Sequence, residues 1–194
     1  KLHRQNLEAE AIGFVTDEDD FVSLNHRNIL ASVFQIDSSL VFLPNDQIYV
    51  EQTLNSVAAS ILGLWHPVIQ RGRAVFRGLG SRDIPVRLVL LESQPQIVLL
   101  DPTLTRNLLA DSDEEISESI KVFLNYHRNS LSKDEIEVLE SSGGEYCEIF
   151  APDQLGAIVC MNTKDPTSMV PAHLPQVGNR EGTVGRLLPG ISAR

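Results

Sequence analysis

Basic residues are scarce in this chain. Its 194 residues include 16 lysines and arginines against 26 aspartates and glutamates, a formal net charge of −10. Nucleic acids and anionic lipid head groups are held by clustered cations, so this balance disfavours binding to either. A run of about 18 apolar residues is also missing, and the amino terminus is polar and mixed in charge. We therefore predict neither a membrane span nor a signal peptide.

Cysteine is almost absent as well. Cys147 and Cys160 are the two cysteines, and each lies within an apolar run. This placement is typical of reduced thiols in a core and disfavours a disulfide. It favours a cytoplasmic location, with tethering to a membrane through other parts of a longer protein as an alternative. Apolar residues make up 42% of the chain, enough for one domain with a substantial core.

Helical and strand patterns alternate along the sequence. Asn25 is a candidate N-cap, and Ser132 with Glu135 forms a capping box. Pro67 is expected to end the second helix, and Ile84, Leu88 and Leu91 share one helical face. The predicted helices cover 26–40, 53–65, 84–93, 103–109 and 132–142; the predicted strands cover 47–50, 73–76, 96–100, 120–124, 145–150 and 157–161. This order predicts an α/β fold, a doubly wound, mostly parallel sheet with helices on both faces.

Residues 165–180, rich in proline and glycine, divide the chain. We predict an α/β unit over 1–164, a loop over 165–180, and the start of a following β segment over 181–194. The sequence begins in a charged stretch, and an alternating pattern starts just before Arg194. From these two features we expect the chain to be a piece of a longer polypeptide.

Two motifs resemble those of adenylate-forming (AMP-binding) enzymes, the acyl-CoA and acyl-ACP synthetase family. The stretch 181–190, EGTVGRLLPG, is similar to the G-x-V-G-R-x-L-P-G stretch that follows the nucleotide site, and Asn25 to Asn28, NHRN, resembles the T-H-R-N that follows the phosphate loop. The synthetase domain of bifunctional acyl-ACP synthetase/2-acylglycerophosphoethanolamine acyltransferases is the most similar type. The resemblance implies one three-layer subdomain of the adenylate-forming fold, without the lid domain that carries the catalytic lysine.

Where the family has functional residues, this sequence differs from it. The glycine- and lysine-containing phosphate loop corresponds to Thr16, Asp17, Glu18, Asp19 and Asp20, whose carboxylates would each repel a triphosphate by roughly 1 kcal/mol even with near-aqueous screening. The small residues that make room for adenine correspond to His127, Arg128 and Asn129. The aromatic-histidine pair corresponds to Asn55 and Ser56.

The family's Y-G-x-T-E motif is altered too, and corresponds to Phe150 to Gln154. Its threonine and glutamate, which serve the phosphates and the metal, are replaced by Asp153 and Gln154. Mg²⁺ prefers carboxylate ligands, and the amide of Gln154 lacks that charge.

The resemblance and these changes together favour a degenerate, noncatalytic AMP-binding-like domain. It would have a structural or interaction role in a larger acyl-activating or phospholipid-acylating protein, with other domains of that polypeptide as partners and no cofactor or metal. One alternative is part of an active fatty-acid ligase that forms an acyl-adenylate with ATP and Mg²⁺, with acyl carrier protein or fatty acid as partner and the missing groups supplied from outside the fragment. Another is a small-ligand or acyl-chain binding module that reuses the acyl pocket of the family.

Other candidate sites are weaker. The acidic run from Asp17 lacks the central glycine and distal glutamate of a calcium loop, so a solvated loop is favoured. His26 is interpreted as structural or exposed, and Trp65 as a core anchor. His127 and Arg128 could bind an anion, although a surface loop is favoured. The sequence has no G-x-S-x-G elbow, and no H-x4-D motif, which disfavours direct phospholipid acylation.

Overall fold

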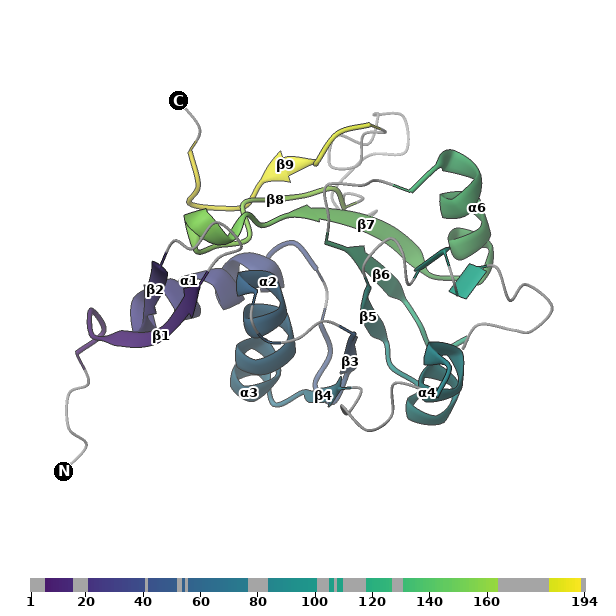
Figure 1. Cartoon of the computed structure of the whole chain (residues 1–194), viewed down its shortest axis with the longest axis horizontal. Coiled ribbons are helices and arrows are strands. Elements are labelled where there is room, and N and C mark those ends of the chain that lie inside the picture. Colours follow the sequence, from purple (N-terminus) through teal and green to yellow (C-terminus); the bar gives the residue numbers. More distant parts are fainter. Residues whose placement is uncertain are drawn as a thin grey trace.

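A twisted sheet runs through the centre of the molecule, with helices on both of its sides and a two-stranded hairpin beside it (Figure 1). The computed structural model describes residues 6–15, 21–40, 42–51, 54, 56–76, 84–100, 105–106, 108–109, 118–126, 131–163 and 182–192. Its strands are β1 (Glu10–Val15), β2 (Phe21–Asn25), β3 (Gln47–Val50), β4 (Arg73–Phe76), β5 (Ile97–Leu100), β6 (Val122–Asn125), β7 (Glu145–Phe150), β8 (Cys160–Met161) and β9 (Arg186–Leu187).

The main sheet has the order β4-β3-β5-β6-β7-β8-β9 within the described part of the chain. Strands β3 to β7 are parallel, whereas β8 and β9 are added antiparallel at one edge. This confirms the predicted α/β class with a mostly parallel sheet. The described part of 181–194 contributes β9 to the same sheet, and the predicted division at 165–180 lies outside the described residues.

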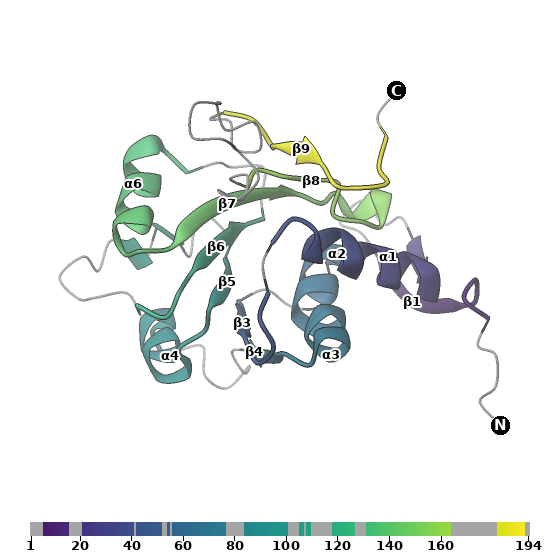
Figure 2. The same ribbon diagram turned by 180° about the vertical axis from the view of Figure 1, so that it is seen from behind.

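Two layers of helix cover opposite faces of this sheet, as the two views of Figures 1 and 2 show. One layer contains α1 (His26–Asp37) and a continuous helical stretch of α2 (Val57–Ser60), the π-helical η1 (Ile61–Trp65) and α3 (His66–Gln70). The other contains α4 (Val86–Ser93) and α6 (Lys133–Ser141). Along β3, Ile48 and Val50 enter the core under the first layer, and Tyr49 enters the core under the second. This alternation explains why the strands read as continuous apolar runs.

Capping side chains begin α1 and α6, as the sequence indicates. The Asn25 side chain accepts from the Asn28 N–H, and the Asn28 side chain accepts from the Asn25 N–H. Ser132 and Glu135 make the same reciprocal pair at α6. Both predicted caps are confirmed, and two of the residues that resemble T-H-R-N have a local structural role.

The second helix does not end before Pro67, and this prediction was wrong. The helix begins at Val57 rather than at residue 53, and it continues through the proline to Gln70. The π turn of η1 lies directly before the proline, where the His66 N–H donates to the Ile61 carbonyl. Such a widened turn relieves the clash of a proline ring with the preceding turn, which is what normally breaks a helix.

Two further differences concern α4 and β8. The predicted apolar face of α4 points outward: Ile84, Leu88 and Leu91 are exposed, whereas Arg87 and Leu90 are buried. The strand predicted over 157–161 is reduced to Cys160–Met161 because only these two residues pair with β9.

Cys147 and Cys160 are both free and buried, as predicted. No helix within the described ranges is long and apolar enough to cross a membrane.

The stretch around Gly185 is held tightly against the sheet edge. Gly185 has φ +80°, and a Cβ there would overlap the carbonyl group of Met161. The Gln35 side chain donates to the Pro189 carbonyl (2.7 Å), which fixes the same stretch to α1. Only glycine combines this backbone conformation with this close approach. The motif most similar to the acyl-activating enzymes therefore carries structural residues.

Candidate functional site

A row of polar residues crosses the sheet where its central strands end. Asn125, the last residue of β6, pairs in register with Glu148 of β7. The Asn162 N–H donates to the Glu148 carbonyl (2.8 Å), so Asn162 continues the row on the next strand. Their sequence neighbours lie in the core under α1 (Leu124, Cys147, Ile149 and Met161). By alternation, the polar row faces the α4 and α6 side, at the edge where open α/β sheets bind ligands.

A hydrogen-bond chain fixes two members of this row. The Tyr146 hydroxyl donates to Glu148 Oε1 (3.1 Å) and accepts from Asn125 Nδ2 (2.9 Å). Burial, and secondly the nearby Glu148 charge, raise the pKa of the Tyr146 hydroxyl well above its usual value, so it stays protonated and available as the donor. The Asn125 Oδ1 atom is buried and has no hydrogen-bond partner. The network thus presents one carboxylate and one unpaired carbonyl oxygen.

An apolar row lies directly beside the polar one, on the same face. Phe150 of β7 pairs with Cys160 of β8, and Cys160 pairs with Leu187 of β9. Phe150 is 42% exposed and Leu187 37% exposed, and the buried Cys160 lies between them. Burial raises the pKa of the Cys160 thiol, which keeps it a neutral, apolar group. This corner of the sheet offers an open apolar surface next to polar acceptors.

Asp153 lies at the same edge and caps a helix. It opens the short 3-10 turn η3 (Asp153–Leu155) after β7, and its Oδ1 accepts from the Val57 N–H (2.8 Å) at the start of α2. Ser56 is the N-cap of that helix, with its side chain accepting from the Ala59 N–H (3.2 Å). A carboxylate is favoured at a helix start because the N–H groups there are unpaired and the helix dipole is positive.

The turn η3 also contacts the β1–β2 hairpin. Gly156, which ends η3 with φ +62°, lies so close to β2 that a Cβ there would come within 2.8 Å of Leu24 Cδ2. The hairpin strands end in the pair Val15 and Phe21, on either side of the acidic run. The hairpin and the segment after β7 therefore lie together in space.

The residues predicted from the sequence fall into two groups. Phe150 ends β7 with an exposed ring, Asp153 caps α2, and Gln154 is exposed beside it. The others lie outside the described residues: Thr16, Asp17, Glu18, Asp19, Asp20, Asn55, His127, Arg128 and Asn129. Their roles stay predictions.

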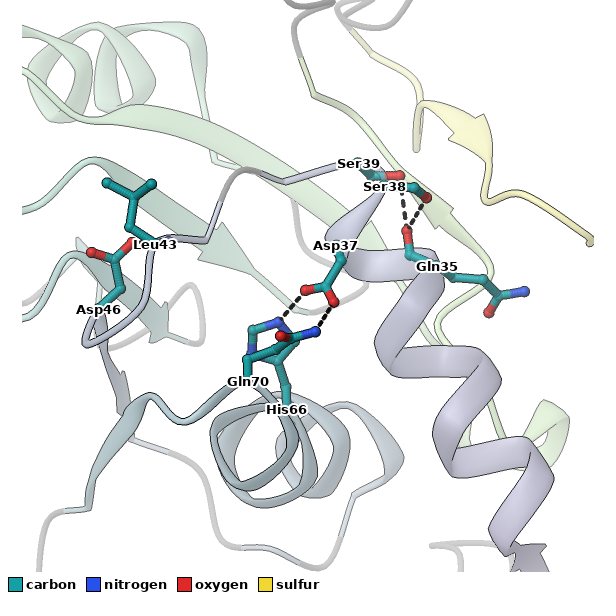
Figure 3. A network of polar contacts seen from close by, with 8 residues as sticks. All are labelled: Gln35, Asp37, Ser38, Ser39, Leu43, Asp46, His66 and Gln70. Carbon is teal, nitrogen blue, oxygen red and sulfur yellow. Dashed lines mark hydrogen bonds and ion pairs between the residues drawn. The ribbon is translucent and has the colours of Figure 1, made fainter. Parts of the chain in front are cut away.

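A second polar cluster lies at the opposite, amino-terminal edge (Figure 3). Buried His66 of α3 has its Nε2 2.7 Å from Asp37 Oδ1, and the Gln70 side chain donates to the other oxygen of Asp37. The Phe42 ring packs on the imidazole with centroids 3.9 Å apart. Burial lowers the pKa of His66, and the hydrogen bond and charge of Asp37 oppose this shift only in part. The hollow beside His66 is about the size of one water molecule, so this cluster joins α1 to α3 rather than forming a ligand site.

Sequence reasoning missed Asn125, Tyr146 and Glu148. The available signal was weak: Asn125 ends the apolar pattern VFLN, and Glu148 interrupts the apolar pattern YCEIF that begins with Tyr146. Only the register of β6 and β7 shows that they form one group. Among the described residues, no three His, Cys, Asp or Glu side chains gather closely enough to hold a metal ion.

No protein-family model and no curated protein matches this sequence. Solved structures do match its fold. A benzoate CoA ligase from Burkholderia xenovorans superposes with a TM-score of 0.77 at 16% identity, covering 97% of this chain and 36% of that one. The N-terminal domain of FACL13 from Mycobacterium tuberculosis superposes with a TM-score of 0.73 at 12% identity, covering 84% of this chain and 41% of that one.

O-succinylbenzoate coenzyme A synthetase from Bacillus subtilis is also similar, with a TM-score of 0.69 at 15% identity, covering 80% of this chain and 33% of that one. This chain thus spans between 33% and 41% of the length of these solved chains. At such low identity the likeness concerns the fold alone. The chain therefore has the same fold as part of these CoA ligase and synthetase structures.

Proposed function

We propose that this chain is a degenerate, noncatalytic AMP-binding-like domain with a structural or interaction role. It would act in a larger acyl-activating or phospholipid-acylating protein, of the acyl-ACP synthetase and acyltransferase type that the sequence resembles. Its partners would be other domains of that polypeptide, in the cytoplasm, with 165–180 as the loop between this unit and the next. No cofactor is required for this role.

The main support for the proposal is the hydrogen bonding of Asp153 and the neutral, exposed side chain of Gln154. They correspond to the threonine and glutamate that serve phosphates and metal in the family that the sequence resembles. Asp153 is engaged by the Val57 N–H, and Gln154 is a neutral, exposed amide. Glu148 and Asn125 Oδ1, at the same edge of the sheet, would add electron-rich oxygens to a phosphate site there. Like charges and unpaired acceptors disfavour a polyphosphate, and an amide is a poor substitute for the carboxylate that Mg²⁺ prefers.

Isothermal titration with ATP and Mg²⁺ tests this proposal. We expect no saturable heat up to millimolar ATP, with the same result for Gln154→Glu, because one restored carboxylate does not replace the cations of a phosphate loop. Micromolar binding of ATP by the unchanged protein would contradict the proposal. Circular dichroism of both proteins controls for folding.

An active ligase is the second candidate, favoured by the extent of the fold match. The match covers 97% of this chain in the benzoate CoA ligase, and the chain spans about a third of that protein, so groups outside this segment could complete a site. The test is acyl-adenylate formation from fatty acid, ATP and Mg²⁺ by the polypeptide as the cell makes it. Activity lost in Asp153→Asn or Gln154→Ala, but kept in Glu137→Gln on α6, would support a ligase and refute the noncatalytic proposal.

A further inference from the structure

The polar and apolar rows at the carboxyl edge form one amphiphilic surface. Glu148 and Phe150 are two positions apart on β7, so their side chains share a face and start about 7 Å apart. Asn125 lies across from Glu148, at the usual spacing of about 5 Å between strands. Leu187 lies two strands from Phe150 in the same row. A small ligand could contact both rows at once.

The hydrogen bonds determine which atoms of the polar row are free. The Tyr146 hydroxyl has one proton, which goes to Glu148 Oε1 (3.1 Å). It must therefore accept from Asn125 through an N–H, and this orients the Asn125 amide with Nδ2 toward the tyrosine (2.9 Å). Asn125 is 3% exposed, and its Oδ1 has no partner. A buried acceptor without a donor is unfavourable, and a ligand N–H would relieve it.

Within the described part of the chain, no salt bridge pairs the Glu148 carboxylate with a cation. Salt bridges among the described residues join Arg27 to Glu8, His66 to Asp37, Lys121 to Asp46, Arg106 to Glu135 and Lys133 to Glu137, and none of these includes Glu148. Arg186 pairs with Met161, whose side chain lies in the core under α1. Residues directly opposite each other on paired strands share a face, so the Arg186 side chain starts on the face of the sheet opposite to Glu148. The Glu148 carboxylate and Asn125 Oδ1 are both acceptors of hydrogen bonds.

We propose that this surface binds a primary ammonium group carried on a short apolar chain or ring. The ammonium donates to Glu148 and to Asn125 Oδ1, and the apolar part covers Phe150 and Leu187. An ammonium suits the site because it has three donors and no acceptor. The inference rests on the proposed function, since a site that binds ATP would not leave these oxygens to a cation.

Titration calorimetry with octylammonium chloride, below its micelle concentration, tests the proposal on the full 194-residue chain. We expect saturable binding by the unchanged protein and no binding of octanoate, which has the same chain and the opposite charge. Glu148→Gln keeps the shape and removes the charge, and should weaken binding at least tenfold. Glu137→Gln, which removes the same charge from exposed α6, should leave binding unchanged. Phe150→Ala should weaken octylammonium binding and leave methylammonium binding as it was.

Three results would overturn the inference. They are no saturable binding of octylammonium, equal affinity for octanoate, or equal affinity in the Glu148→Gln and Glu137→Gln proteins. If Glu148→Gln does not fold, Phe150→Ala decides the matter, because its exposed ring can be shortened without opening the core. A parallel ATP–Mg²⁺ titration separates the two proposals. ATP binding would remove the proposed function, whereas failure of the amine alone leaves that function standing.

Discussion

Replacing Gly185 with alanine should loosen the β9 edge of the sheet. Gly185 has φ +80°, a conformation that costs a residue with a Cβ about 1–2 kcal/mol. The added Cβ would also overlap the Met161 carbonyl group, which is backbone and cannot rotate away. Forcing an atom into such a packed position costs about 1–3 kcal/mol more. The total penalty is about 2–5 kcal/mol.

Gly182 provides the matched control for this change. It also has a positive φ, +72°, but a Cβ there would have no atom within 4 Å. Gly182→Ala should therefore cost only the conformational part, about 1–2 kcal/mol. The difference between the two variants isolates the contact with Met161, at about 1–3 kcal/mol.

Hydrogen exchange is the suitable assay because β9 is an edge strand that can open without global unfolding. The Leu188 N–H, which donates to the Val159 carbonyl (2.9 Å), reports on this edge. It should exchange roughly 5- to 150-fold faster in Gly185→Ala than in Gly182→Ala. Amides of β5 in the sheet centre should be less affected. Equal exchange of Leu188 in the two variants would refute the reasoning, since it would show that the close approach does not hold β9.

The remaining predictions concern acid stability, helix capping and thiol reactivity. Burial lowers the pKa of His66, so as the pH falls the unfolded chain takes up a proton at this histidine before the folded protein does. The urea concentration at the midpoint of unfolding should therefore be lower at pH 5.5 than at pH 7.5. This decrease should be smaller in the His66→Gln protein. An equal drop in that variant would exclude His66 as the cause. Asp153→Ala should lower the free energy of unfolding in urea by about 0.5–2 kcal/mol, whereas exposed Gln154→Ala should stay within about 0.5 kcal/mol; equal effects would contradict the capping role. Burial raises the pKa of both thiols, so iodoacetamide at pH 8 should label Cys147 and Cys160 only after unfolding, as mass spectrometry would show. Rapid labelling of the native protein would contradict their placement.

Local chemistry made much of the fold predictable. The caps at Asn25 and Ser132 depend on side chains within a few residues, and the strands are apolar on both faces because helices cover both. The end of the second helix was missed because the rule about proline assumes a regular α-helix, and the π turn before Pro67 removes that assumption. The exposure of the apolar face of α4 could not be predicted from the periodicity of the sequence. Periodicity shows that residues share a helical face, but not whether that face points to the core or to solvent.

The candidate site was harder to predict because its contacts are long-range. The segment from Phe150 to Gln154 was found through its resemblance to a motif. Nothing near Asp153 in the sequence indicates that it caps a helix 96 positions earlier. Glu148 and Asn125 come together through strand register, which sequence pattern alone does not fix across a parallel sheet.

The bond between Asp153 and α2 also bears on how reversible such a change of motif is. Restoring the threonine of the resembled motif at this position would remove the carboxylate that accepts from the Val57 N–H. The helix start would lose about 0.5–2 kcal/mol of stabilisation before any phosphate or metal was gained. A second change, supplying a new cap for α2, would have to come first or at the same time. Under the proposed function, position 153 would be a former ligand position that now stabilises the fold, and regaining the chemistry would require more substitutions than the sequence difference suggests.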